Sequence, residues 1–168
     1  DPAIILNSHK KPDYSLYGEK GATQAQVYFN PFEVTNERDS FDLSIVVTNL
    51  GKAQNDTFNL SITRTFPNNT DTTYEVLLHD VYYRDTVTIT LPVDIGSSVG
   101  INKFDISIDP LGVLDEITTV NNVASVNMLI KSSEIIPVYP FEFAVVPNKY
   151  TVMKASTGDA YAPFNSYV

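Results

Sequence analysis

Apolar and polar residues alternate strictly over five short stretches of this chain. A period of two places every second side chain on the same side of a pleated strand, and β-branched residues suit that surface. The apolar members of the five stretches are Phe41, Leu43, Ile45 and Val47; Phe58, Leu60 and Ile62; Val87, Ile89 and Leu91; Phe104, Ile106 and Ile108; and Ala124, Val126, Met128 and Ile130. Each stretch therefore predicts a strand with one buried face.

Less regular segments add to this set. Residues 14–17 and 24–29 predict an opening strand that is split or bulged, and residues 74–83 predict a strand that bends or lies at a sheet edge. Asn49 and Gly51 are suited to a tight turn, because both residues tolerate positive φ and the Asn side chain can bond its own backbone. No window carries an apolar stripe of helical period. The pattern predicts an all-β fold, an antiparallel immunoglobulin-like β-sandwich of about seven or eight strands with Greek-key connections.

The ends of the chain differ from this core. Residues 1–11 are predicted to approach the sandwich from a preceding domain, and residues 12–131 to form it. Residues 132–168 are rich in proline, which disfavours a central strand. They predict a linker and the start of a following domain, or an added edge strand in which Phe141, Phe143 and Val145 line one face. We therefore expect the chain to be a piece of a longer protein.

Composition and charge exclude several functions. The 168 residues carry 11 basic and 20 acidic side chains, a formal charge of -9, so no basic surface is expected to neutralise nucleic acid or an anionic membrane. No apolar run approaches the roughly 20 residues of a membrane span. The chain has no cysteine, which excludes thiol nucleophiles, disulfides and zinc–thiolate sites. We expect neither nucleic-acid binding nor membrane insertion.

Several motifs occur in an order that resembles the CARDB module, a cell-adhesion-related domain found in bacteria. They are Pro12-Asp13-Tyr14-Ser15-Leu16, Thr48-Asn49-Leu50-Gly51, the strand residues 100–109, and the Asp115-Glu116 and Asn121-Asn122 pairs before the last strand. The likeness covers about residues 12–131, although the connection 17–40 is longer than the family pattern. It implies an immunoglobulin- or fibronectin-III-like sandwich in a secreted or cell-surface bacterial protein.

An acidic and amide cluster near the last strand is the first candidate site. It consists of Asp109, Asp115, Glu116, Asn121 and Asn122. Oxygen ligands from one loop suit calcium, which takes six to eight oxygens, but the spacing is not that of an EF-hand. Two interpretations stay open, a calcium site and a hydrogen-bonded loop without metal, and the second is favoured. No other cofactor is expected.

Tyrosines form the second candidate site. Tyr74, Tyr82 and Tyr83 could give an aromatic platform for sugar rings, or they could be ordinary residues of a tyrosine-rich sandwich. Catalysis has little support, because the two histidines, His9 and His79, are isolated and no Gly-x-Ser-x-Gly elbow presents a serine. The chain is therefore not expected to be an enzyme.

Together these patterns favour a non-catalytic structural or adhesion-type module of a larger extracellular or cell-surface protein. Its expected partners are neighbouring domains of the same chain, and a surface protein or polysaccharide. The alternative is a carbohydrate-binding module that assists a secreted enzyme.

Overall fold

A computed structural model describes residues 9–19, 21–133, 151–152 and 163–164 of the chain. The chain divides into two compact units, residues 1–133 and 134–168. In the second unit, β10 (Thr151–Val152) pairs antiparallel with β11 (Pro163–Phe164). The predicted edge strand with Phe141, Phe143 and Val145, and most of the predicted approach segment 1–11, lie outside the described residues. The roles assigned to residues 1–11 and 132–168 stay predictions.

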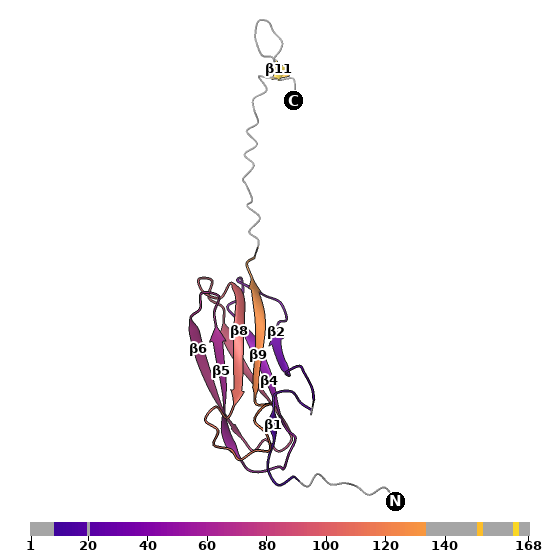
Figure 1. Cartoon of the computed structure of the whole chain (residues 1–168). Helices are drawn as coiled ribbons and strands as arrows, with labels where there is room; N and C mark the ends of the chain where they lie inside the picture. Colours follow the sequence, from indigo (N-terminus) through magenta and orange to yellow (C-terminus); the bar gives the residue numbers. More distant parts are fainter. Residues whose placement is uncertain (1–8, 20, 134–150, 153–162, 165–168) are drawn as a thin grey trace, which may run out of the picture. The chain divides into compact units, whose positions relative to one another are not determined.

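The first unit is a sandwich of two β-sheets. Its strands are β1 (Tyr14–Ser15), β2 (Val27–Asn30), β3 (Val34–Thr35), β4 (Ser40–Asn49), β5 (Thr57–Thr65), β6 (Asp71–His79), β7 (Arg84–Pro92), β8 (Gly100–Ile108) and β9 (Val123–Lys131). One sheet places β4 between β7 on one side and β1 with β2 on the other, and the second has the order β3-β9-β8-β5-β6 (Figure 1). The non-consecutive pairs β4–β7 and β5–β8 are Greek-key connections. The predicted immunoglobulin-like sandwich is confirmed.

The alternating residues fill the space between the sheets. Every apolar residue of the five predicted stretches is buried, except Ile89 and Val126, which are half-buried against the core. Phe29, Phe41 and Phe104 meet with ring centroids 5.4 to 6.3 Å apart, which joins the two sheets. The opening strand is split as predicted, because β1 and β2 pair with different parts of β4.

Two strand predictions need correction. The stretch 74–83 does lie at a sheet edge, but β6 ends at His79 because Asp80 has a φ of 53°. Tyr82 and Tyr83 therefore lie in the connection to β7. The sandwich is also not wholly antiparallel, since β3 pairs in parallel with β9 through Val34 and Ile130.

The turn after β4 confirms one part of the prediction, the bonding of the Asn49 side chain to its own stretch of backbone, but not the positive φ values. Neither Asn49 nor Gly51 is among the described residues with positive φ. The Asn49 side chain instead accepts hydrogen bonds from the N–H groups of Asp13 and Gly51, and its amide donates to the carbonyls of Lys52 and Val81. Position 51 requires glycine because a Cβ there would lie 2.4 Å from the Lys11 carbonyl oxygen. The motif thus joins the entering chain to β4.

A charged side chain lies in the core that the alternation predicted to be apolar. Arg64 continues the inward series of β5 and is fully buried, at 0% exposure. Its guanidinium donates to Asn102 Oδ1 from Nε (3.1 Å) and Nη2 (2.9 Å), to Ser98 Oγ (3.1 Å) and to the Pro92 carbonyl (2.7 Å). It also lies 4.3 Å from the centroid of the Phe66 ring. Burial lowers the pKa of Arg64, and the neighbouring Tyr74 opposes this shift.

The chain enters and leaves the sandwich at opposite ends. Tyr14 pairs with Asn49 at the end of β4, whereas Lys131 at the end of β9 accepts a hydrogen bond from Asn36, just before β4 begins. Figure 1 shows the first described residues at one end of the strands and the end of β9 at the other. Within the described part of the chain, no helix has the length and hydropathy needed to cross a membrane.

Candidate functional site

The acidic and amide cluster lies in the loop between β8 and β9, where it supports the loop and the entering strand. Asp109 directly follows β8 and has a left-handed conformation with a φ of 45°. Its carboxylate accepts a hydrogen bond from the Leu114 N–H at 2.8 Å. The Gly112 N–H donates to the Asp109 carbonyl and closes a turn directly after β8. The buried carboxylate of Asp109 therefore stabilises its own loop.

Glu116 connects this loop to β1. Its Oε2 accepts the Tyr14 N–H at 2.8 Å and its Oε1 accepts the Asn122 amide at 2.7 Å. Backbone bonds from Leu16 to the Asn121 carbonyl and from Ile117 to the Pro12 carbonyl continue the connection on both sides. Burial raises the pKa of Glu116, and the two hydrogen bonds only partly oppose this effect.

The other cluster residues are also engaged. Asp115 is exposed and forms an ion pair with Lys11 at 2.6 Å, and the Asn121 amide donates to Asp13 Oδ1 at 3.1 Å. Asn121 Oδ1 and Asn122 Oδ1 are buried and have no hydrogen-bond partner in the part of the chain that the structure describes. Each carboxylate oxygen of Glu116 already accepts one hydrogen bond, from the Tyr14 N–H or from the Asn122 amide. No group of three or more His, Cys, Asp or Glu side chains in the described ranges is arranged to hold a metal.

The structure does not bring the three predicted tyrosines together. Tyr74 lies on the inward face of β6, opposite Ile62 of β5, and packs half-buried against the core near Arg64. Tyr82 and Tyr83 follow the end of β6 and are 52% and 72% exposed. The Tyr82 hydroxyl donates a hydrogen bond to Asn55 Oδ1 at 3.4 Å, whereas Tyr83 lines a hollow on another part of the surface.

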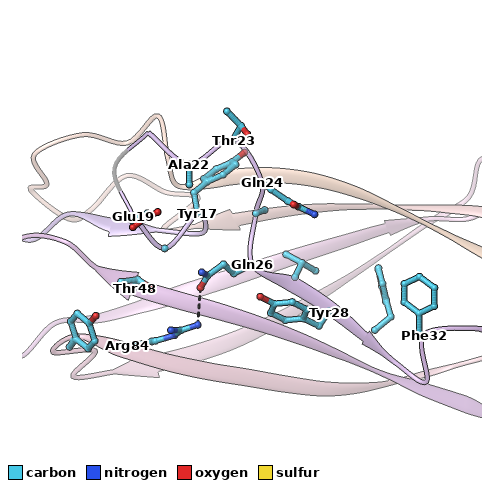
Figure 2. Close-up of a pocket in the computed structure, with 15 residues that line it drawn as sticks. Tyr17, Glu19, Ala22, Thr23, Gln24, Gln26, Tyr28, Phe32, Thr48 and Arg84 are labelled. Atoms are coloured by element: carbon cyan, nitrogen blue, oxygen red, sulfur yellow. Dashed lines mark hydrogen bonds between the residues drawn. The ribbon is translucent and has the colours of Figure 1, made fainter.

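This hollow, here called the split-strand pocket, has a volume of about 640 Å³. The pocket forms where the chain turns away from β4 after β1. An excursion that includes residues 16–19 and 21–26 follows, and the chain then pairs with β4 again as β2. The Gln26 N–H donates to the Leu16 carbonyl at 2.7 Å and closes the base of this excursion. Side chains from the excursion, from β2 and the turn after it, from β4 and from the start of β7 line the pocket (Figure 2).

Aromatic and polar groups share the pocket. Figure 2 shows Gln26 in its centre, accepting a hydrogen bond from Arg84 Nη2 at 3.0 Å, with Tyr28 and Phe32 to one side. The Gln26 amide fits against Gly18, where a Cβ would lie 2.4 Å from Nε2. The Thr48 hydroxyl in the lining is buried and has no partner among the described residues.

Sequence reasoning missed this pocket apart from Tyr83. The one available signal was the connection 17–40, whose length departs from the pattern that the motifs resemble. Length alone does not show that β1 and β2 flank an open loop on the same edge of β4, because that arrangement depends on pairing between distant residues. Tyr28, Phe32 and Arg84 therefore gave no local signal of a shared site.

Of three comparisons with known proteins, the search of solved structures finds matches. No protein-family model and no curated protein sequence matches the chain. A search of solved structures finds the CARDB domain of the PF1109 protein from Pyrococcus furiosus, in complex with di-metal ions, at 18% identity and a TM-score of 0.49; the match covers 79% of this chain and 97% of that one. A solution structure of the same domain matches at 17% identity, 72% and 96% coverage, and a TM-score of 0.45.

The search also finds a domain of a protein named as a cell surface protein from Methanosarcina acetivorans. It is 16% identical, the match covers 71% of this chain and 92% of that domain, and the TM-score is 0.49. Both source organisms are archaeal. At these scores and identities, the similarity concerns the arrangement of strands and does not assign a function.

Proposed function

We propose that residues 12–131 form a non-catalytic spacer module of a larger extracellular or cell-surface protein. The observation that carries the proposal is the position of the two points at which the chain enters and leaves the sandwich. The chain joins the sandwich at β1 and leaves it at β9, at opposite ends of one continuous core. Segments attached before β1 and after β9 are therefore held apart by the length of the sandwich.

The polar clusters support a structural role. The carboxylates of Asp109 and Glu116 accept hydrogen bonds from peptide N–H groups, and the Asn49 side chain bonds four backbone groups around the entering chain. His79 lies on the exposed edge strand, where its Nδ1 is bonded to Thr57 Oγ1 at 3.1 Å. Glu116 and Asn49 fix the point at which the chain enters the sandwich, which a spacer requires.

The proposal is tested by measuring the distance across the sandwich. The chain has no cysteine, so Lys10→Cys and Ser132→Cys give two unique positions for spin labels. Because β9 has nine residues and a strand rises about 3.3 Å per residue, we expect a single narrow distribution centred at about 30 to 40 Å. A matched control, Lys10→Cys with Lys52→Cys, labels two positions at the same end and should give less than half that distance.

A broad distribution for the Lys10/Ser132 pair in native buffer would contradict the spacer role, because it would show that the module does not fix the separation of its ends. A distance equal to that of the control pair would contradict the proposed path of the chain.

A further inference from the structure

We propose that the split-strand pocket binds a neutral polysaccharide. This inference goes beyond the spacer role and does not depend on it, because the pocket lies on the side of the sandwich and not at its ends. The proposed sugar site differs from the tyrosine platform suggested by the sequence, because Tyr83 lines the pocket and Tyr74 and Tyr82 do not.

Exposed aromatic rings are the first argument. Tyr28, Phe32 and Tyr83 are 56%, 88% and 72% exposed, and all three line the same hollow although they come from β2, the turn after it and the connection before β7. Single exposed aromatics are common on proteins, but three around one pocket mark a binding surface. Their flat faces suit the C–H face of a pyranose ring, and the tyrosine hydroxyls also offer polar contacts.

Hydrogen-bonding groups between these rings are the second argument. Gln26 and Arg84 hold each other in place through their 3.0 Å bond, and the other N–H donors of the guanidinium have no hydrogen-bond partner among the described residues. Gly18 leaves the space that the Gln26 amide occupies. A pocket with planar apolar faces and fixed donors and acceptors matches a ligand whose rings carry hydroxyl groups at their edges.

The polar surface beside the pocket favours a chain of sugars over a single ring. Tyr28 lies opposite Ser44 of β4, and Ser44 is bonded to Thr88 of β7 at 2.9 Å. The Thr90 hydroxyl donates to Asp42 Oδ1 at 2.7 Å. Asp42 and Thr90 form the next pair of β4 and β7 residues on the same face of the sheet. This row of hydroxyl groups continues outward from the aromatic side of the pocket and could contact further sugar units.

Charge decides between neutral and acidic glycans. Among the described residues that line the pocket, the charged ones are Arg84 and Glu19, which have opposite signs. The whole chain carries a formal charge of -9, which opposes the approach of a polyanion. A neutral polysaccharide is therefore favoured over a uronate polymer.

The test is affinity electrophoresis of the 168-residue chain in gels that contain soluble β-glucan, xylan or galactomannan. Parallel gels contain polygalacturonate, as the acidic glycan, or casein, as an extended polypeptide. We expect at least one neutral polysaccharide to retard the protein. Tyr83→Ala and Arg84→Met should each weaken that binding about tenfold or more, which corresponds to about 1.4 kcal/mol.

Tyr82→Ala is the matched control, because Tyr82 is the adjacent exposed tyrosine and does not line the pocket. It should bind like the unmodified chain, and circular dichroism should show that all variants are folded. No retardation by any neutral polysaccharide would overturn the proposal, as would equal losses for Tyr82→Ala and Tyr83→Ala.

Retardation by polygalacturonate alone, or by casein alone, would also overturn the proposal, and would assign the pocket to acidic glycans or to peptides. The distance measured with the Lys10/Ser132 labels does not involve the pocket. A failure of the polysaccharide proposal is therefore distinguishable from a failure of the spacer role.

Discussion

Replacing the buried Arg64 with methionine removes a cation from the core and keeps a long side chain in its place. Four hydrogen bonds are lost: two to Asn102 Oδ1, one to Ser98 Oγ and one to the Pro92 carbonyl. These partners come from the end of β7, the loop after it and β8, so the substitution should weaken the packing of one whole end of the sandwich.

The expected cost follows from the acceptors that remain. Asn102 Oδ1 and the Pro92 carbonyl would lose the donors that Arg64 provides, and an unsatisfied buried polar group costs about 1–3 kcal/mol. The interaction of the guanidinium with the Phe66 ring is also lost, although a methionine sulfur replaces part of it. Removing a buried charge recovers some desolvation energy. We expect a net loss of about 4 kcal/mol in the free energy of unfolding.

Urea unfolding followed by circular dichroism and tyrosine fluorescence measures this loss, since the chain has no tryptophan. For a domain of this size the loss corresponds to a fall in Tm of about 12–16 °C. Arg38→Met is the control, because Arg38 is exposed and the substitution is the same; it should change the free energy by less than about 0.5 kcal/mol. A loss for Arg64→Met below about 1 kcal/mol would refute the reasoning.

A double-mutant cycle with Asn102→Leu then tests whether the two side chains act as a unit. Arg64→Met and Asn102→Leu together should cost at least about 1 kcal/mol less than the sum of the single variants, because each single variant leaves a buried group unpaired. Additivity within about 0.5 kcal/mol would show that the Arg64–Asn102 bonds are not coupled.

Three further outcomes are expected. Gly51→Ala should destabilise the fold by about 2–3 kcal/mol in urea unfolding, because the new Cβ would meet backbone atoms at 2.4 and 2.7 Å. Gly112→Ala, which has open space around it and a φ of 64°, should cost only about 1 kcal/mol. The reverse order would contradict the close-approach explanation. Burial raises the pKa of Glu116 above its ordinary value of 4.5, so its contribution to stability is present in full below pH 4.5 and is lost as the pH rises through the raised pKa. Glu116→Gln should therefore lessen the decline of the unfolding free energy just above pH 4.5. Curves of unfolding free energy against pH that stay parallel for the two proteins would contradict this. Adding a calcium chelator should leave the Tm unchanged, because peptide and amide groups already bond the carboxylates of Asp109 and Glu116; a fall in Tm would favour the calcium interpretation.

The strands could be predicted from the sequence because burial of one sheet face imposes a period of two on the residues that form it. That rule found β4, β5, β7, β8 and β9, and it would also have placed Arg64 inward, as the residue that follows Phe58, Leu60 and Ile62 at the same spacing. The rule gives the direction of a side chain and not its partners. The acceptors of Arg64 lie 28 to 38 positions away in the sequence, so no local pattern could identify them.

The candidate sites were harder to predict for a related reason. The acidic and amide residues were found as a group because they share one loop, but their partners Tyr14, Lys11 and Asp13 come from the other end of the sequence. The three tyrosines are near in sequence, yet the end of β6 at His79 separates Tyr74 from the other two. The split-strand pocket joins residues from four segments, and only the paired strands bring them together.

The opposite positions of the two chain ends have a mechanical consequence. A pull applied between residue 12 and residue 131 is directed along the strands, whereas the hydrogen bonds between antiparallel strands run across them. The bonds that join β1 and β2 to β4, and β8 to β9, would then be loaded in shear and would resist the tension together. Peeling, in which bonds fail one after another, would require a pull across the sheet.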